Sequence, residues 1–110
     1  MSIAQTSDRR IKDQTEDASL IDLQAIFDST EAKTYTRTDV EGKRYGFIAQ
    51  DVQAKTPKDI TNIVFEQGGE GGDDENPLLA IDYSRLVTVL WGVCKNQQKQ
   101  IDELIAKVGS

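Results

Sequence analysis

Apolar positions in the first part of the chain indicate one short helix after a polar lead-in. Residues 1–18 are polar and show no sustained periodicity, so we expect an extended or loosely ordered segment. Within residues 19–27 apolar side chains recur at i, i+3, i+6 and i+7, which is the spacing of one helix face. Ser19 or Asp17 is suited to cap this helix.

The middle of the chain alternates between strand and helix patterns. Residues 33–40 are rich in Thr and β-branched side chains, and a Glu-Gly turn separates them from residues 43–49, which predicts a β-hairpin. Residues 50–56 run up to a proline and fit a short helix that ends there. Residues 60–65 and 77–83 are candidate strands.

An acidic, glycine-rich stretch separates the last two candidate strands. Residues 67–76, QGGEGGDDEN, contain four glycines and four acidic residues, a composition that favours a mobile, solvated loop. The carboxylates lack the alternating spacing and the distant Glu of a calcium-binding EF-hand loop. We therefore predict no metal site here and no cofactor.

The strongest periodic pattern lies in residues 84–108, a predicted long helix whose interior has Gly92 as its one helix breaker and which Ser84 is suited to cap. Asp82 is expected at the helix start. Successive gaps along the apolar ridge are 4, 3, 4, 4, 3 and 4, which is coiled-coil spacing with one stutter. The ridge comprises Leu86, Leu90, Val93, Gln97, Ile101, Leu104 and Val108.

This ridge predicts self-association, with the polar Gln97 setting the register. Packing of the helix on its own domain is the competing interpretation, because Val87, Val89 and Trp91 lie off the ridge. Both interpretations hold together if the first half of the helix packs locally and the second half bundles with copies of itself.

Composition and net charge limit the functions that are expected of this chain. Of 110 residues only 37% are hydrophobic, which is lean for a self-sufficient core yet too apolar in places for disorder, so we expect partner chains to complete the core. A net charge of −6 disfavours binding to nucleic acid or anionic lipid. No leader-like segment and no apolar run of roughly 18 residues is present, so we expect a soluble protein made in a cytoplasm.

The composition of this chain allows few combinations of catalytic residues. Without His and with Cys94 as its single cysteine, it lacks a His-based triad, a zinc site and an internal disulfide, and we expect Cys94 as a small buried residue. Ser7 and Lys12 form one possible nucleophile and base, since nearby cations such as Arg9 and Arg10 favour a neutral lysine. Ser and Lys occur at this separation by chance in most chains, so on spacing alone a polar linker with solvated charges is the favoured interpretation.

Three separated motifs resemble one known family. SDRRIK at residues 7–12, YGFIAQDV at 45–52, and IDYSRL at 81–86 before a Gln-rich helix are together similar to the intramolecular chaperone domain of phage tail fibres and tailspikes, also called the S74 peptidase family. The motifs occur in the family's order and extend over nearly the whole chain.

The resemblance implies a function and its residues. In that family the domain follows a β-structured fibre, drives its trimerisation and folding, and then cuts itself off. It therefore implies a homotrimer, the upstream fibre as partner, and a single-turnover, self-cleaving serine endopeptidase with Ser7 as nucleophile and Lys12 as base. It also implies action in the host-cell cytoplasm during virion assembly and release from the mature fibre.

The same resemblance places the cut at or beside Ser7, foremost at the Ser7-Asp8 bond. A serine that attacks its own carbonyl closes a four-membered ring, whereas attack on the preceding carbonyl closes a favourable five-membered one. Cutting after Ser7 therefore calls for a neighbouring chain's Ser or a water molecule, while an N-to-O shift would cut the Thr6-Ser7 bond. Both bonds remain open at this point.

We thus expect an α+β fold in which short helices and a β-hairpin pack on a long C-terminal helix that forms a trimeric helical bundle. The expected parts are a cleavage-site lead-in at 1–18, a chaperone core at 19–83 with the mobile loop at 67–76, and a trimerisation helix at 84–108. Because few residues precede Ser7, we expect the chaperone part alone. A non-catalytic trimerisation module, or a helical adaptor for an unrelated partner, are the alternatives.

Overall fold

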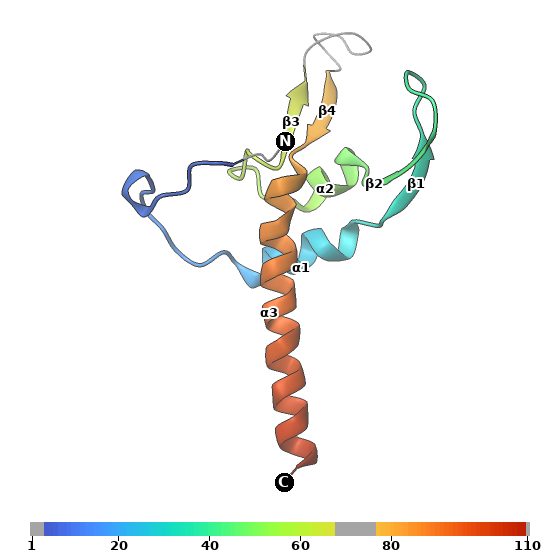
Figure 1. Cartoon of the computed structure of the whole chain (residues 1–110). Helices are drawn as coiled ribbons and strands as arrows, with labels where there is room; N and C mark the ends of the chain where they lie inside the picture. The colour runs from blue at the N-terminus through green and yellow to red at the C-terminus, as the bar shows by residue number, and fades with distance from the viewer. Residues whose placement is uncertain (1–3, 68–76, 110) are drawn as a thin grey trace.

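The computed structural model describes residues 4–67 and 77–109 and has an α+β fold, as the patterns predict. A long helix forms a stem, and the other elements surround its upper half (Figure 1). The elements in chain order are η1 (Arg9–Ile11), α1 (Leu20–Ser29), β1 (Lys33–Thr36), β2 (Lys43–Gly46), α2 (Ala49–Lys55), β3 (Val64–Gln67), β4 (Leu78–Ile81) and α3 (Tyr83–Val108).

Two separate antiparallel hairpins confirm the strand predictions but shorten them. β1 pairs with β2, Lys33 lying opposite Gly46, and β3 pairs with β4, Val64 lying opposite Ile81. β3 begins at Val64, four residues later than predicted, because residues 57–63 form turns and bends instead. Gln67, the predicted first residue of the mobile loop, ends β3, and the remainder of that loop lies outside the described residues.

Helix caps follow the sequence closely, with one correction. The Ser19 hydroxyl accepts a hydrogen bond from the Asp22 backbone N–H at the start of α1, as predicted. At the start of α3, however, the Asp82 carboxylate accepts the bond from the Ser84 N–H at 3.1 Å. Asp82 is therefore the N-cap, and the prediction of Ser84 in that role is wrong by two positions.

The core is small and lies where α1, α2, the β3–β4 hairpin and the first half of α3 meet. Helices α1 and α3 approach closely at Gly92, where an added Cβ would lie 2.4 Å from Leu23 Cδ1. The absence of a side chain at Gly92 therefore lets α1 seat against α3. The central cluster of buried residues is Ile26, Val52, Ile63, Leu86 and Val89.

The β1–β2 hairpin is attached to the stem at its base. The Phe47 backbone N–H donates to the Tyr83 hydroxyl at 3.1 Å, and the two rings stack with centroids 5.9 Å apart. A Cβ on Gly46 would come within 2.9 Å of that hydroxyl and 3.0 Å of the Tyr35 ring. Glycine at this position therefore makes room for the hydroxyl that holds the hairpin.

The whole molecule exposes more surface than a compact monomer of its size. Its accessible surface is 9598 Å², whereas a compact chain of this mass exposes about 6,000 Å². The radius of gyration is 17.6 Å, against about 13 Å for a compact domain. Two segments contribute to the excess, since all residues in 4–20 and all residues in 97–109 are exposed. Within the described residues, no helix has the length and hydropathy needed to span a membrane.

Candidate functional site

A single turn of 3₁₀ helix brings the two predicted catalytic residues together. The Asp8 carboxylate caps η1 by accepting from the Arg10 N–H at 2.8 Å. The Lys12 N–H donates to the Arg9 carbonyl at 3.1 Å, which closes the turn and folds Lys12 back along the chain. The Lys12 Nζ then donates to the Ser7 Oγ at 2.5 Å.

This Ser7–Lys12 hydrogen bond has the geometry that a nucleophile and its general base require. Lys12 Nζ and Ser7 Oγ are close enough to each other for direct proton transfer. In its ammonium form Lys12 donates to Ser7, and in its amine form the same line of approach lets it accept the Ser7 proton. The pairing of Ser7 with Lys12, first inferred from the family resemblance, is thus present as a contact within one chain.

Asp8 has a structural part in the turn besides its place next to Ser7. Its two carboxylate oxygens accept from the Arg10 Nε at 3.1 Å and from the Arg10 Nη2 at 2.9 Å. These bonds, together with that from the Arg10 backbone, hold the pKa of Asp8 below its usual value. Because the ion pair is exposed, it sets the local conformation rather than adding much stability.

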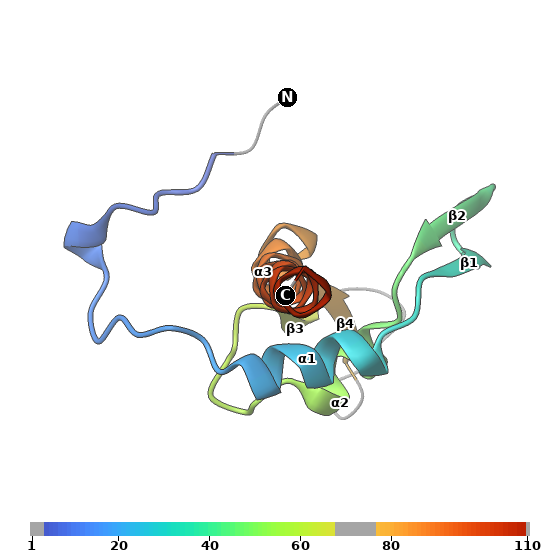
Figure 2. The ribbon, with the colours of Figure 1, turned by 90° about the horizontal axis from the view of Figure 1, so that it is seen from below.

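The lead-in that carries this turn is open to solvent. All described residues from 4 to 20 are exposed. In both ribbon views the segment around η1 stands away from α3 before the chain returns to α1 (Figures 1 and 2). The hydrogen-bonded Ser7 and Lys12 therefore lie on an exposed arm that leaves a wide surface free around them.

The predicted association ridge on α3 divides into buried and exposed members. Leu86 and Val93 are 7% and 1% exposed and lie in the chain's own core, which leaves them little surface for a partner. The other five members, Leu90, Gln97, Ile101, Leu104 and Val108, are exposed.

The exposed side of α3 follows a different and more regular register. If the ridge is drawn through Val87 instead of Leu86, and through Cys94 instead of Val93, the spacings between its successive members become 3, 4, 3, 4, 3 and 4. This spacing is an unbroken heptad repeat. We call this set the α3 stripe: Val87, Leu90, Cys94, Gln97, Ile101, Leu104 and Val108, all of them exposed.

Two residues of the α3 stripe were not selected by sequence reasoning. Cys94 is exposed, so the prediction of a buried Cys94 is wrong for the single chain. Val87 is 54% exposed and was assigned to local packing. The stutter in the predicted ridge is the signal that could have identified both residues. A heptad repeat appears interrupted when some of its positions are assigned one residue away from the true ones. Trp91 and Ile105, both exposed, widen the stripe.

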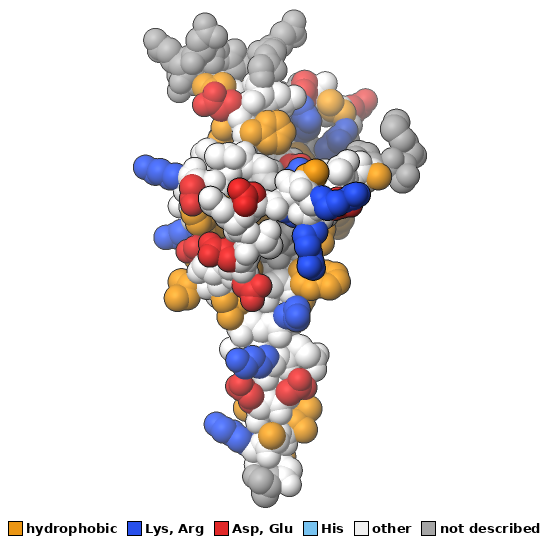
Figure 3. Space-filling view, turned by 90° about the vertical axis from the view of Figure 1, so that its left-hand side faces the viewer, with side chains coloured by type: hydrophobic (Ala, Val, Ile, Leu, Met, Phe, Trp, Pro, Cys, Tyr) orange, Lys and Arg blue, Asp and Glu red, His pale blue; other side chains and the backbone are white. Residues whose placement is uncertain are grey.

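The stripe runs along the stem beside charged faces. Figure 3 shows Lys, Asp and Glu side chains covering the lower stem in that view, with hydrophobic side chains along its edge. Seen along α3, the helices α1 and α2 lie below it and the β1–β2 hairpin lies to its right (Figure 2). Within the described residues the stem thus has a polar face, a face against its own domain, and an exposed apolar stripe.

Comparison with known proteins gives a family match that covers half of the chain. No match among curated proteins was found. No group of three or more potential metal ligands occurs among the residues that the structure describes. The sequence profile of Peptidase_S74, described as chaperone of endosialidase, matches residues 7–61, half of the chain, from the nucleophile through α2. The chain therefore belongs to the Peptidase_S74 family, the chaperones of endosialidase.

Proposed function

We propose that this chain is a C-terminal intramolecular chaperone that trimerises, guides the folding of an upstream β-structured phage fibre or tailspike, and then releases itself by autoproteolysis at or next to Ser7. The observation that carries the proposal is the 2.5 Å hydrogen bond between Lys12 Nζ and Ser7 Oγ. Membership of the family supplies the chaperone context. Action in the host-cell cytoplasm during virion assembly is part of the same proposal.

The proposed chemistry begins with proton transfer from Ser7 to the neutral amine of Lys12. In the N-to-O route the Ser7 oxygen attacks the Thr6 carbonyl, the Thr6-Ser7 C–N bond breaks, and the protonated Lys12 returns a proton to the departing Ser7 amine. Water then hydrolyses the resulting ester. Cleavage of Ser7-Asp8 instead requires the Ser7 oxygen of a neighbouring chain, or a water molecule that Lys12 activates.

Assembly is the proposed trigger of cleavage. Ser7 and Lys12 are exposed in the single chain. Docking of a neighbouring chain over the arm would exclude water and supply oriented N–H donors for an oxyanion. Cleavage would then report completed assembly and remove the route back to the precursor.

The α3 stripe is the proposed trimer interface. It comprises seven exposed positions in an unbroken heptad repeat, and it extends from the first half of α3 to the end of the helix. Its composition has one feature that favours a different number of strands. Val87, Ile101 and Val108 are β-branched residues at one core position, and Leu90 and Leu104 occupy the other, a pattern common in two-stranded coiled coils. The trimer therefore rests on family membership, and a dimer is the competing state.

A non-catalytic association module is the second candidate function. Its support is the contrast between a complete α3 stripe and a catalytic pair that stands in open solvent. This candidate predicts the same oligomer but no cut. A monomer in solution would contradict both candidates and favour the adaptor for an unrelated partner.

The decisive experiment measures the intact mass, under denaturing conditions, of the chain with its native upstream fibre. We expect two fragments from the wild type and one uncut chain from Ser7→Ala and from Lys12→Ala. Ser2→Ala and Lys58→Ala are matched controls, which should be cut like the wild type. The fragment masses identify the bond. An oligomeric wild type that stays whole would leave only the association module.

A further inference from the structure

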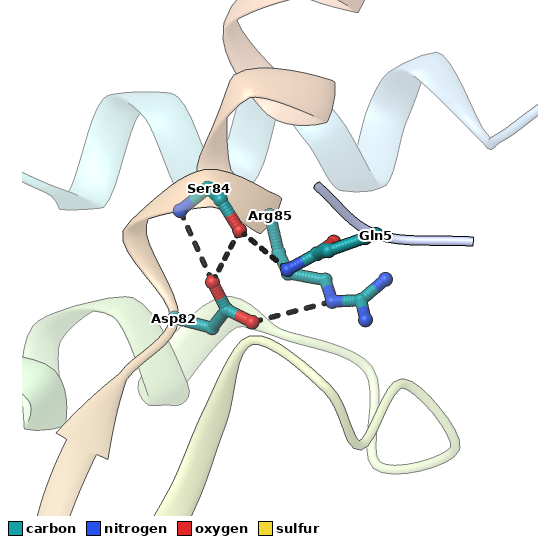
Figure 4. Close-up of polar contacts among 4 residues, drawn as sticks. All are labelled: Gln5, Asp82, Ser84 and Arg85. Carbon is teal, nitrogen blue, oxygen red and sulfur yellow. Dashed lines mark hydrogen bonds and ion pairs between the residues drawn. The ribbon is translucent and has the colours of Figure 1, made fainter. Parts of the chain in front are cut away.

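The arm that carries Ser7 is attached to the first turn of α3 by a long-range contact. The Gln5 Nε2 donates to the Ser84 Oγ at 3.1 Å, joining residues 79 positions apart. Figure 4 shows the Gln5 side chain pointing from the arm toward the start of the helix, where Ser84, Asp82 and Arg85 form one polar cluster. Neither the candidate catalytic chemistry nor the α3 stripe accounts for this contact.

Hydrogen bonding in the cluster determines what Ser84 can offer to the arm. The Ser84 hydroxyl has one proton, and it donates this proton to the Asp82 carboxylate at 2.6 Å. Toward Gln5 the same oxygen therefore acts as an acceptor. Residue 5 must supply a donor, which the amide of Gln5 does and which a carboxylate or an apolar side chain would not.

The cluster is rigidly held by the fold. Asp82 is the N-cap of α3, and its own backbone N–H donates to the Ile63 carbonyl at 2.8 Å. The Arg85 Nε donates to the other Asp82 oxygen at 3.3 Å. The next residue, Leu86, is buried in the core. The acceptor at Ser84 is thus held at the start of α3, which is joined to Ile63 just before β3 and to the core through Leu86.

The opposite side of Ser7 is held by a second set of contacts. Asp8 caps the η1 turn through Arg10, as described above. The contact at Gln5 and the turn at Asp8 therefore enclose a short span of the chain, Thr6 and Ser7. Both candidate scissile bonds, Thr6-Ser7 and Ser7-Asp8, lie between the two anchors.

We propose that Ser84, oriented by Asp82, is a positioning residue for the self-cleavage, and that it acts by holding Gln5 and so the acyl side of the scissile segment. Fixing both ends of a reacting segment lowers the entropic part of its barrier. Because the anchor point forms only in the folded domain, the contact also makes cleavage depend on the folding of α3. This role rests on the proposed function and adds two residues to it.

The test measures the rate of self-cleavage of the chain with its native upstream fibre. We expect Gln5→Met and Ser84→Ala each to slow cleavage about 3- to 10-fold, the effect of losing one hydrogen bond. The double variant should be no slower than either single variant. Gln5→Lys keeps a donor and should cleave near the wild-type rate. Gln14→Met, in the same exposed lead-in, is the matched control and should have no effect.

Thermal unfolding of each variant separates positioning from general destabilisation. Gln5 lies on an exposed arm, so Gln5→Met should melt with the wild type even if Ser84→Ala disturbs the helix start. If both single variants cleave at the wild-type rate, or if the double variant is slowed by the product of the two single effects, Gln5 and Ser84 do not act as one anchor. Either result would overturn the positioning role and leave autoproteolysis itself unaffected. An uncut wild type would overturn the proposed function, and this role with it.

Discussion

The two halves of α3 differ in what their apolar side chains contact. In residues 83–94 the helix has two apolar faces, one buried against its own domain through Leu86, Val89 and Val93, and one exposed at Val87 and Leu90. In residues 95–108 it has one apolar face, and no element among the described residues covers it. A bare helix of this length is marginal in water unless it packs. The comparison teaches that one helix contributes to the core in its first half and exposes an apolar face in its second half, where we propose that copies associate.

The largest expected effect comes from placing the same substitution in each half. Leu86→Ala removes a buried side chain and should lower the free energy of unfolding by about 2–5 kcal/mol, at every protein concentration. Leu104→Ala changes a side chain that is 61% exposed in the single chain and should act through association alone. Urea unfolding at several protein concentrations checks this difference. Equal losses, both independent of concentration, would show that the halves do not differ as described.

A second prediction tests the register of the α3 stripe within the first half. Val87→Asp places a carboxylate on the stripe and should weaken association by about 1–3 kcal/mol per chain. The core should remain folded because Val87 is exposed in the single chain. Lys95→Asp is the control, since Lys95 is exposed on the same helix but lies off the stripe. Sedimentation equilibrium gives the association constants. An oligomer that Val87→Asp does not weaken would contradict the α3 stripe and favour the ridge first predicted, which includes Leu86 and Val93.

The smallest expected effect concerns the start of the first half and its dependence on pH. Hydrogen bonds from Ser84, helped by the charge of Arg85, hold the pKa of Asp82 below its usual value. A lowered pKa means that the carboxylate stabilises the fold near neutral pH, and that this contribution is lost as the pH falls below about 4. Wild-type thermal stability should therefore fall more between pH 5 and pH 2.5 than that of Asp82→Asn. Parallel pH profiles would contradict the capping role.

Local features of the fold were predictable because neighbouring residues determine them. The Ser19 cap, the β1–β2 pairing and the helix that ends near Pro57 all depend on interactions between residues close in the chain. The predicted Glu41-Gly42 turn is longer in the structure, because residues 37–42 connect the two strands. The Ser7–Lys12 pair was chosen by resemblance, and the capped turn that joins the two residues is equally local.

What the sequence did not reveal depends on packing. Leu86 and Val87 are adjacent and both apolar, and only the position of α1 decides which of them is buried. A single ridge drawn through both halves of α3 therefore combined two faces and produced a stutter. The contact between Gln5 and Ser84 spans most of the chain, and no periodicity or short motif signals such a pairing.

The Gln5–Ser84 contact also bears on what happens after the cut. Gln5 lies upstream of either candidate bond, so in the proposed reaction it would depart with the fibre, whereas Ser84 would stay with the chaperone. Before cleavage the two residues share one chain, and the high effective concentration lets a single neutral hydrogen bond hold them together. After cleavage that advantage is gone, and the bond is too weak to retain a separate molecule. The proposed anchor is thus strong enough to position the substrate before cleavage and too weak to delay the departure of the product.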